Sequence, residues 1–183
     1  MAGKFDRLNA RFTKFIQGQK LFFVATADRD GRVNMSPKGL DSLRVLGDDR
    51  IVWLSLTGSG NETAAHLKHH DRITMMFCAF EGDALILRVY GHGTVIHPHD
   101  AEWPELSGLF EPMAGARQAI DVRINLVTTS CGTGIPVLEF QRERGPDELL
   151  PFYADMNEQQ QTEYWQRKNL TSIDGKPTGI FGQ

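Results

Sequence analysis

A glycine-rich turn is the stretch whose residue types and spacing best suit the binding of an anion. The apolar run Ile51–Leu56 predicts a buried strand, and Thr57–Asn61 then breaks it. Ser59 lies three residues before Glu62, the spacing of a capping box, so a helix can begin at Ser59 or at Asn61. The unpaired N–H groups of a helix start carry partial positive charge, and neighbouring glycines let an anion approach them. This turn is therefore a candidate phosphate site.

An ordinary capped turn is the competing interpretation of the same residues. Small polar side chains are what any strand-to-helix turn needs, and Glu62 would repel an anion as readily as it caps the helix. Taken by itself, the turn favours capping over ligand binding. The sequence has no G-x-x-x-x-G-K-[ST] motif and no G-x-G-x-x-G after a strand, so it predicts neither a nucleotide-hydrolase P-loop nor a dinucleotide-binding fold.

A strip of small polar side chains forms the second candidate site. Side chains alternate between the two faces of a strand, so within residues 33–39 Val33 and Met35 share one face. The opposite face carries Asn34, Ser36 and Lys38. Pro37 cannot donate to a ladder, which predicts a strand edge or a bulge where a ligand can reach the backbone. A solvated strand face is the alternative, although such a face usually carries more charge and bulk than asparagine and serine.

The spacing of the histidines and cysteines does not predict a metal site. Strand alternation points His92 and His97 to opposite faces, and no acidic or cysteine ligand recurs at matched spacing near them or near His99. We therefore expect surface histidines, and we expect the same of three on the polar side of the helix after the turn: His66, His69 and His70. Cys78 and Cys131 form neither a disulfide framework nor a zinc cluster, and both are expected to be reduced.

The overall charge and hydropathy exclude several classes of partner. The net charge is −3, with 20 Lys and Arg against 23 Asp and Glu, so no basic field attracts nucleic acid or an acidic membrane. No apolar run approaches the roughly 20 residues that span a bilayer, and the N-terminus lacks the apolar core of a signal peptide. We expect a cytoplasmic protein without nucleic-acid or membrane partners.

Apolar periodicity and turn residues predict a mainly β fold with α decoration. Strands are expected at Leu21–Ala27, Val33–Gly39, Leu43–Leu46, Ile51–Leu56, Arg72–Phe80, Leu85–His97, Ile120–Thr128 and Val137–Phe140. Helices are expected at Phe5–Gln17, at Asp100–Phe110 with Asp100 as N-cap, and, singly or as a pair, between Pro146 and Leu170. The connections are too short for crossovers, and Gly91 and Gly93 allow a barrel corner. The chain therefore predicts one domain, residues 1–183: an antiparallel closed or split β-barrel, with a helix first and an irregular docked tail, Ser172–Gln183, last.

Five segments in this order resemble the pyridoxamine 5′-phosphate oxidase-like family of split-barrel flavoproteins. They are NMSPKG, WLSLTGSGNETAAHLKHHDRITMMFCAF, LRVYGHGTV, TSCGTGIP and KNLTSIDGKPTG. The resemblance implies an FMN-binding split barrel that forms a homodimer, with FMN in two equivalent interface clefts and a small-molecule substrate. It implies that the strand of Lys38 runs beside the flavin and that residues 56–63 hold the ring edge and the phosphate.

The resemblance and the polar strip together give a set of expected cofactor-binding residues. Lys38, with Arg88 behind it, is the expected cation near the pyrimidine edge of the flavin, and the loop at Ser130 and Cys131 is expected to contribute from either subunit. Cys131 is expected to be a packed or loop cysteine rather than a redox-active one. The full set is Asn34, Ser36, Pro37, Lys38, Leu56, Thr57, Ser59, Gly60, Asn61, Thr63, Arg88, Ser130 and Cys131.

The chain departs from the family where cations would bind the phosphate. The oxidases of this family carry arginine and lysine where this chain has Glu62 and Thr63, and arginine where it has Val33. Charge-assisted hydrogen bonds are roughly twice as strong as neutral ones, so FMN is expected to be anchored here by backbone N–H groups, Ser59, Asn61, Thr63 and Lys38. The chain also has no clear match to the basic and histidine residues with which those oxidases bind the phosphate of their substrate, so oxidation of pyridoxamine phosphate itself is not expected. The prediction is an FMN-dependent oxidoreductase of another small molecule. The alternatives are a non-catalytic flavin, deazaflavin or haem protein acting as carrier or sensor, and a structural dimer with an empty cleft.

Overall fold

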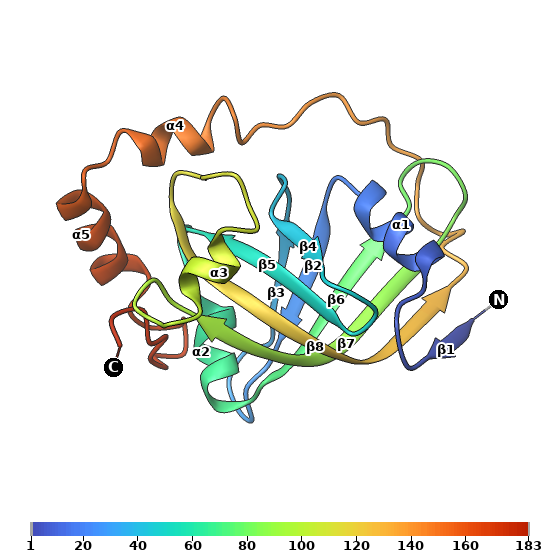
Figure 1. Ribbon diagram of the computed structural model, residues 1–183, viewed down its shortest axis with the longest axis horizontal. Coiled ribbons are helices and arrows are strands. Elements are labelled where there is room, and N and C mark those ends of the chain that lie inside the picture. The colour runs from blue at the N-terminus through green and yellow to red at the C-terminus, as the bar shows by residue number, and fades with distance from the viewer. Residues whose placement is uncertain (1, 183) are drawn as a thin grey trace.

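The structure, a computed structural model, describes residues 2–182 and is built on one curled antiparallel sheet (Figure 1). The strands are β1 (Gly3–Phe5), β2 (Phe22–Thr26), β3 (Asn34–Lys38), β4 (Leu43–Val45), β5 (Arg50–Leu56), β6 (Arg72–Cys78), β7 (Ile86–Ile96) and β8 (Ala116–Ser130). Their order is β3-β2-β6-β7-β8-β5-β4, and β1 also pairs with β8. The end strands β3 and β4 do not pair with each other, so the barrel is split. The expected antiparallel split β-barrel is confirmed.

Five helices accompany this sheet in residues 2–182. They are α1 (Ala10–Gly18), α2 (Glu62–His69), α3 (Trp103–Ser107), α4 (Leu149–Ala154) and α5 (Glu158–Lys168). Of these, α2 contacts β7 and β2, and α3 contacts β8. In Figure 1 the chain after β8 arches across one side of the barrel before it reaches α4 and α5. No helix among residues 2–182 is long and apolar enough to cross a membrane.

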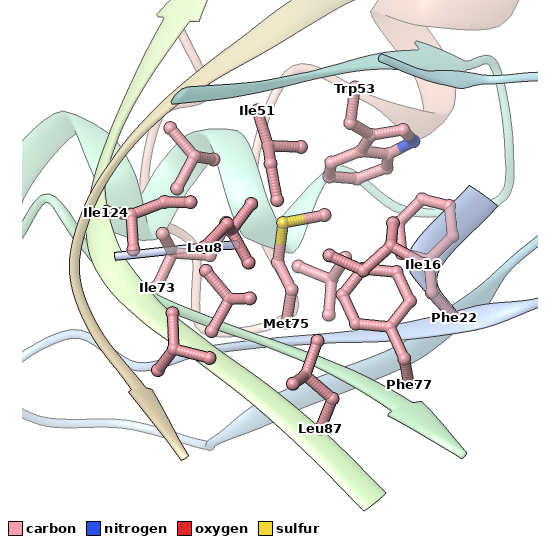
Figure 2. Close-up of a cluster of buried hydrophobic side chains, with 14 of the residues drawn as sticks. Leu8, Ile16, Phe22, Ile51, Trp53, Ile73, Met75, Phe77, Leu87 and Ile124 are labelled. Atoms are coloured by element: carbon pink, nitrogen blue, oxygen red, sulfur yellow. The ribbon is translucent and has the colours of Figure 1, made fainter. Parts of the chain in front are cut away.

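The core fills the interior of the half-barrel (Figure 2). Strand alternation buries Leu87 and Val89 of β7 against Met75 of β6, and α1 closes one end with Ile16. Trp53 of β5 lies at the edge of this cluster, where its ring meets that of Phe22 edge to face with 6.2 Å between centroids. A second cluster packs on the other face of β5, so β5 is buried on both sides, as its unbroken apolar run predicts: Val52, Leu54, Ile96, Leu106, Phe110 and Ala119.

Two β-bulges on β8 bend the sheet. Tyr90 pairs with Leu126 and Gly91 with Ile124, which leaves Asn125 as an extra residue on β8. A Cβ atom on Gly91 would clash with the carbonyl oxygen of Arg123, so only glycine fits this corner. The expected bend at Gly91 is thus a close approach of two backbones.

The second bulge lies where β8 begins. Ser55 pairs with Gln118 and Leu56 with Ala116, so Arg117 has no partner on β5. A bulged residue leaves the regular alternation, which redirects its side chain.

Several expected boundaries were wrong, because local hydrogen bonds decided them. Helix α1 begins after Asn9, whose Oδ1 accepts the N–H of Phe12 at 3.0 Å, and Phe5 lies in β1 instead. Asp100 does not cap a helix: its carboxylate accepts the N–H of His97 at 2.7 Å, and α3 begins at Trp103. Strand β8 begins four residues earlier than expected, at Ala116, because β5 runs beside it that far.

The expected strand Val137–Phe140 is absent, and these residues form an extended strap. Its Leu138 N–H donates to the carbonyl of Phe80 at 2.9 Å, and the Phe140 N–H donates to a carboxylate oxygen of Glu81 at 2.9 Å. One backbone hydrogen bond does not make a ladder. Val137 is 83% exposed, so the apolar residues that suggested a strand do not enter the core.

The C-terminal tail docks on the barrel, as expected, although Gln183 lies outside the described residues. Thr171 and Pro177 form an antiparallel bridge that closes a turn. Lys176 Nζ donates to Asp28 at 2.6 Å, and the carboxylate of Asp174 accepts the N–H of Arg32 at 2.7 Å. The tail therefore holds the hairpin between β2 and β3.

We predict that Gly91→Ala lowers the free energy of unfolding by about 2 to 3 kcal/mol, because the added methyl group must displace the β8 backbone. Urea unfolding would measure this. Gly18→Ala is the matched control, since a Cβ atom there meets nothing within 4 Å, and it should leave stability unchanged or raise it slightly. Equal stability of the two variants would contradict the close approach.

Candidate functional site

A cleft of about 950 Å³ opens between β3, β5 and the start of α2. The chain that continues from the strap, residues 140–145, and the start of α4 form the outer wall of the cleft. The polar strip of β3, which ends at Lys38, and the glycine-rich turn, which begins at Thr57, both border this cleft. Of the expected site residues, those that line it are Asn34, Ser36, Pro37, Lys38, Leu56, Thr57, Ser59, Gly60 and Thr63.

Asn34 connects the two predicted parts of the site. Its Nδ2 donates to Thr26 Oγ1 and to Thr63 Oγ1, each at 3.1 Å. The same Thr26 hydroxyl lies 3.0 Å from Nδ1 of His66. His66 is buried on the inner side of α2, so the expectation of a surface histidine was wrong for this residue. The hydrogen bonds fix β3 against the first turn of α2.

Four expected site residues do not line the cleft of their own chain. Asn61 is buried, and its side-chain amide exchanges hydrogen bonds with that of Gln118, at 2.8 and 3.3 Å. This exchange replaces the expected side-chain cap, because Asn61 makes no cap hydrogen bond in α2. The other three lie near the end of β8 that is remote from Leu56: Arg88, Ser130 and Cys131.

Arg88 and Ser130 form a separate pair on the β7–β8 ladder. Arg88 Nη1 donates to Ser130 Oγ at 3.2 Å. The cleft borders the Ala116 end of β8, and Ser130 is the last residue at the other end, so the length of this strand separates them. Sequence order could not show this, because the loop after β8 contains the same small residues as a ligand-binding loop.

Lys38, the cation that the sequence analysis expected beside a flavin, lines the cleft. Its Nζ lies 4.9 Å from the centroid of the Trp53 ring, within the range of a cation–π contact. Burial, and then the positive charge of Arg117, lower the pKa of Lys38 to about 8. This amine therefore titrates just above neutral pH.

Arg117 is the cleft residue that sequence reasoning missed. It is only 5% exposed, and neither its Nε nor its Nη1 has a hydrogen-bond partner among residues 2–182. Burial lowers its pKa to about 10, so it is still charged at neutral pH. The signal that could have found it is an arginine at the start of a strand that is otherwise uncharged as far as Asp121.

The C-terminal region holds the glycine-rich turn from outside. Trp165 Nε1 donates to Thr57 Oγ1 at 2.9 Å, and Asn169 Nδ2 donates to the carbonyl of Gly58 at 2.8 Å. The carboxylate of Glu62 accepts the N–H of Ile173 at 3.0 Å. Glu62 is therefore bound by the tail, which reduces the repulsion that it would exert on an anion at the turn.

The backbone of the turn remains available for a ligand. Among the described residues, the N–H groups of Ser59 and Gly60 have no hydrogen-bond acceptor. Both residues line the cleft and directly precede α2, where the helix start adds partial positive charge. A buried arginine, a half-buried lysine and free amides therefore border one cavity, which suits a ligand carrying negative charge.

Histidines and acids do not gather into a metal centre in the part of the chain that the structure describes, since no group of three or more His, Cys, Asp or Glu side chains there could hold an ion. His97 is buried rather than exposed, and its burial lowers its pKa to about 4. Cys131 is exposed, and a hydrogen bond with Thr133 lowers the pKa of its thiol.

Known proteins share both the sequence and the fold. The family model described as pyridoxamine 5′-phosphate oxidase matches residues 8–131. The pyridoxamine 5′-phosphate oxidase family protein ustO of Aspergillus flavus is 33% identical over an alignment of 192 residues, gaps included. The alignment covers 94% of this chain and 76% of that protein.

Two solved structures show the same fold at low sequence identity. HupZ of Group A Streptococcus superposes with a TM-score of 0.55 at 20% identity, over 65% of this chain and 91% of that chain. A putative pyridoxamine 5′-phosphate oxidase of Lactobacillus delbrueckii superposes with a TM-score of 0.52 at 17% identity, over 67% and 94%. From the family match and the fungal relative, this chain belongs to the pyridoxamine 5′-phosphate oxidase family.

Proposed function

We propose that the protein binds FMN in this cleft and acts as an oxidoreductase on a small molecule. One observation carries the proposal: Lys38 of β3 and the free amides of Ser59 and Gly60 border the same cavity. Family membership supports it, since the resemblance implies a flavin between such a strand and such a turn. The cavity of about 950 Å³ falls within the range of cofactor sites.

The residues present fit a flavin mononucleotide in charge and in shape. Arg117 lines the cleft, and its buried Nε and Nη1 donors have no hydrogen-bond partner among residues 2–182. An anionic ligand would supply the missing acceptors. Leu56, which is half-buried, and Phe152, which is 52% exposed, supply apolar surface at the cleft for a planar ring. Small residues such as Ser36 leave room beside β3.

In the proposed chemistry the protein binds the flavin and stabilises negative charge on its ring. A bound flavin supplies hydride or electron transfer. Lys38 places a positive charge where negative charge on the ring would be stabilised, and the strap at Phe140 restricts access of water from the open side.

We also propose that the protein is a homodimer. The outer face of the edge strand β3 exposes Val33 and Met35, at 74% and 61% of their surface. An unpaired edge strand with exposed apolar side chains is a surface that proteins normally cover. A second copy covering β3 would lie beside the cleft, as the family resemblance implies.

We predict that the purified protein carries or takes up FMN, and that its affinity falls about tenfold as the pH rises from 7 to 9. Lys38 is protonated below its pKa of about 8 and neutral above it, so the attraction between its charge and the anionic FMN is present at low pH and lost as pH rises. Fluorescence titration with FMN at each pH measures the affinity.

Lys38→Met should bind FMN weakly at both pH values and lose this pH dependence, whereas Lys38→Arg should retain tight binding at pH 9. Lys14→Met, which removes an exposed lysine from α1, should behave as the wild type. A colourless protein that FMN does not titrate would refute the proposal, and a Soret band would indicate haem in its place. Bleaching by NADH or NADPH, with reoxidation in air, would distinguish an enzyme from a carrier.

We predict that Met35→Lys converts the dimer into a monomer, because it places a charge in the proposed interface. Sedimentation velocity measures the mass. Ile173→Lys is the control, since Ile173 is equally exposed but lies on the docked tail. A wild-type chain that sediments as a monomer at every concentration would exclude the dimer.

A further inference from the structure

We propose that Arg117 is an oxyanion-binding residue of the cleft and that its ligand is a phosphate group. The inference rests on the proposed function, because it takes the cleft as the ligand site. It names the residue that compensates for the phosphate-binding cations this chain lacks at Val33, Glu62 and Thr63. The phosphate belongs either to the flavin nucleotide or to a phosphorylated second molecule.

The burial of Arg117 destabilises the folded protein unless a ligand pairs with it. A charged group removed from water costs several kcal/mol, and unpaired buried donors add to that cost. Arg117 is 5% exposed, with Nε and Nη1 lacking partners among residues 2–182. Its lowered pKa of about 10 still lies far above neutral pH, so the side chain does not escape the cost by losing its proton.

The bulge on β8 is what directs Arg117 to the cleft. Its neighbours Ala116 and Gln118 keep their places opposite Leu56 and Ser55, and Arg117 is the extra residue between them. As the extra residue, Arg117 leaves the regular alternation of the strand. Its side chain lines the cavity, whereas the amide of the next residue, Gln118, is bound to Asn61.

The groups around Arg117 do not neutralise it. Lys38 repels it, which is the second cause of the lowered pKa of Lys38. No carboxylate is among the groups that favour its charge, which are the hydroxyls of Tyr153 and Tyr164, and burial raises the pKa of Tyr153 to about 12. Two cations thus face one cavity, and a bound oxyanion would relieve the repulsion between them.

The carboxylates that line the cleft are Glu62, Glu143 and Glu148. Glu62 accepts the N–H of Ile173, and Glu148 lies 3.8 Å from Arg142. None of the three forms an ion pair with Arg117 among the described residues. A phosphate is a suitable ligand for Arg117, because a planar guanidinium group can donate two parallel hydrogen bonds to a phosphate.

The test compares FMN, riboflavin and inorganic phosphate as ligands of the full-length protein freed of bound flavin. The variants are Arg117→Met, Arg117→Lys and the control Arg123→Met, which removes an exposed arginine from the same strand. Fluorescence titration gives the affinities, and thermal unfolding gives the stability with and without each ligand.

If Arg117 binds the phosphate of FMN, Arg117→Met should weaken FMN binding roughly ten- to a hundredfold and leave riboflavin affinity within about twofold. The FMN affinity of Arg117→Lys should lie between those of the wild type and Arg117→Met, because lysine keeps the positive charge but lacks the paired N–H donors of the guanidinium group. Without ligand, Arg117→Met should be at least as stable as the wild type, since a buried unpaired charge is gone.

If the phosphate belongs to a second molecule, inorganic phosphate should raise the unfolding temperature of the FMN-loaded wild type but not that of FMN-loaded Arg117→Met. Unchanged FMN affinity together with unchanged stabilisation by phosphate would overturn the inference. A ligand-free Arg117→Met protein that is less stable than the wild type would also count against it, by showing a structural role. Failure of the wild type to bind either flavin would instead refute the proposed function, and the phosphate measurement on the ligand-free proteins would still test Arg117.

Discussion

The hydrogen-bond ladder of β8 is the constraint on which the rest of this structure depends. This strand pairs with β7 along most of its length, with β5 over its first half and with β1 near its end. Antiparallel pairing of one long strand with two neighbours fixes the curvature of the whole sheet. The two bulges on β8 then bend that sheet, at Asn125 opposite the Gly91 corner and at Arg117 beside the cleft.

The split in the barrel follows from this curvature and from the edge residues. The sheet ends at β3 and β4, and Pro37 removes one donor from the β3 edge. Lys38, the last residue of β3, lies over the ring of Trp53 in β5. A cavity with polar walls thus remains next to a well-packed core, and the β5 side chains contribute to both.

The cleft holds positive charge that the fold does not neutralise. The backbone N–H of Ile173 donates to the carboxylate of Glu62. Asp147 and Glu148 lie near Arg142, at 2.9 and 3.8 Å. Lys38 and Arg117 line the cavity. Such an arrangement costs stability in the empty protein and becomes favourable when an anion binds. This charge distribution supports the proposed binding of an anionic ligand in the cleft.

The C-terminal region contributes through contacts that are remote in sequence. Trp165, Asn169 and Ile173 bond to residues 57, 58 and 62, more than a hundred positions earlier. These bonds hold the glycine-rich turn in place. A turn that looked like ordinary capping in the sequence is thereby supported from outside the barrel.

The sequence by itself determined the elements whose patterns are local. Alternation identified the polar face of β3, the apolar run identified β5, the paired glycines identified the corner in β7, and the ordered segments identified the family. The tertiary structure alone decided how Arg117, Asn61 and the Arg88–Ser130 pair are placed, and that residues 137–140 form a strap. The physical reason is that a bulge changes the register by one residue and a long strand separates its two ends, and neither effect leaves a periodic signal in the chain.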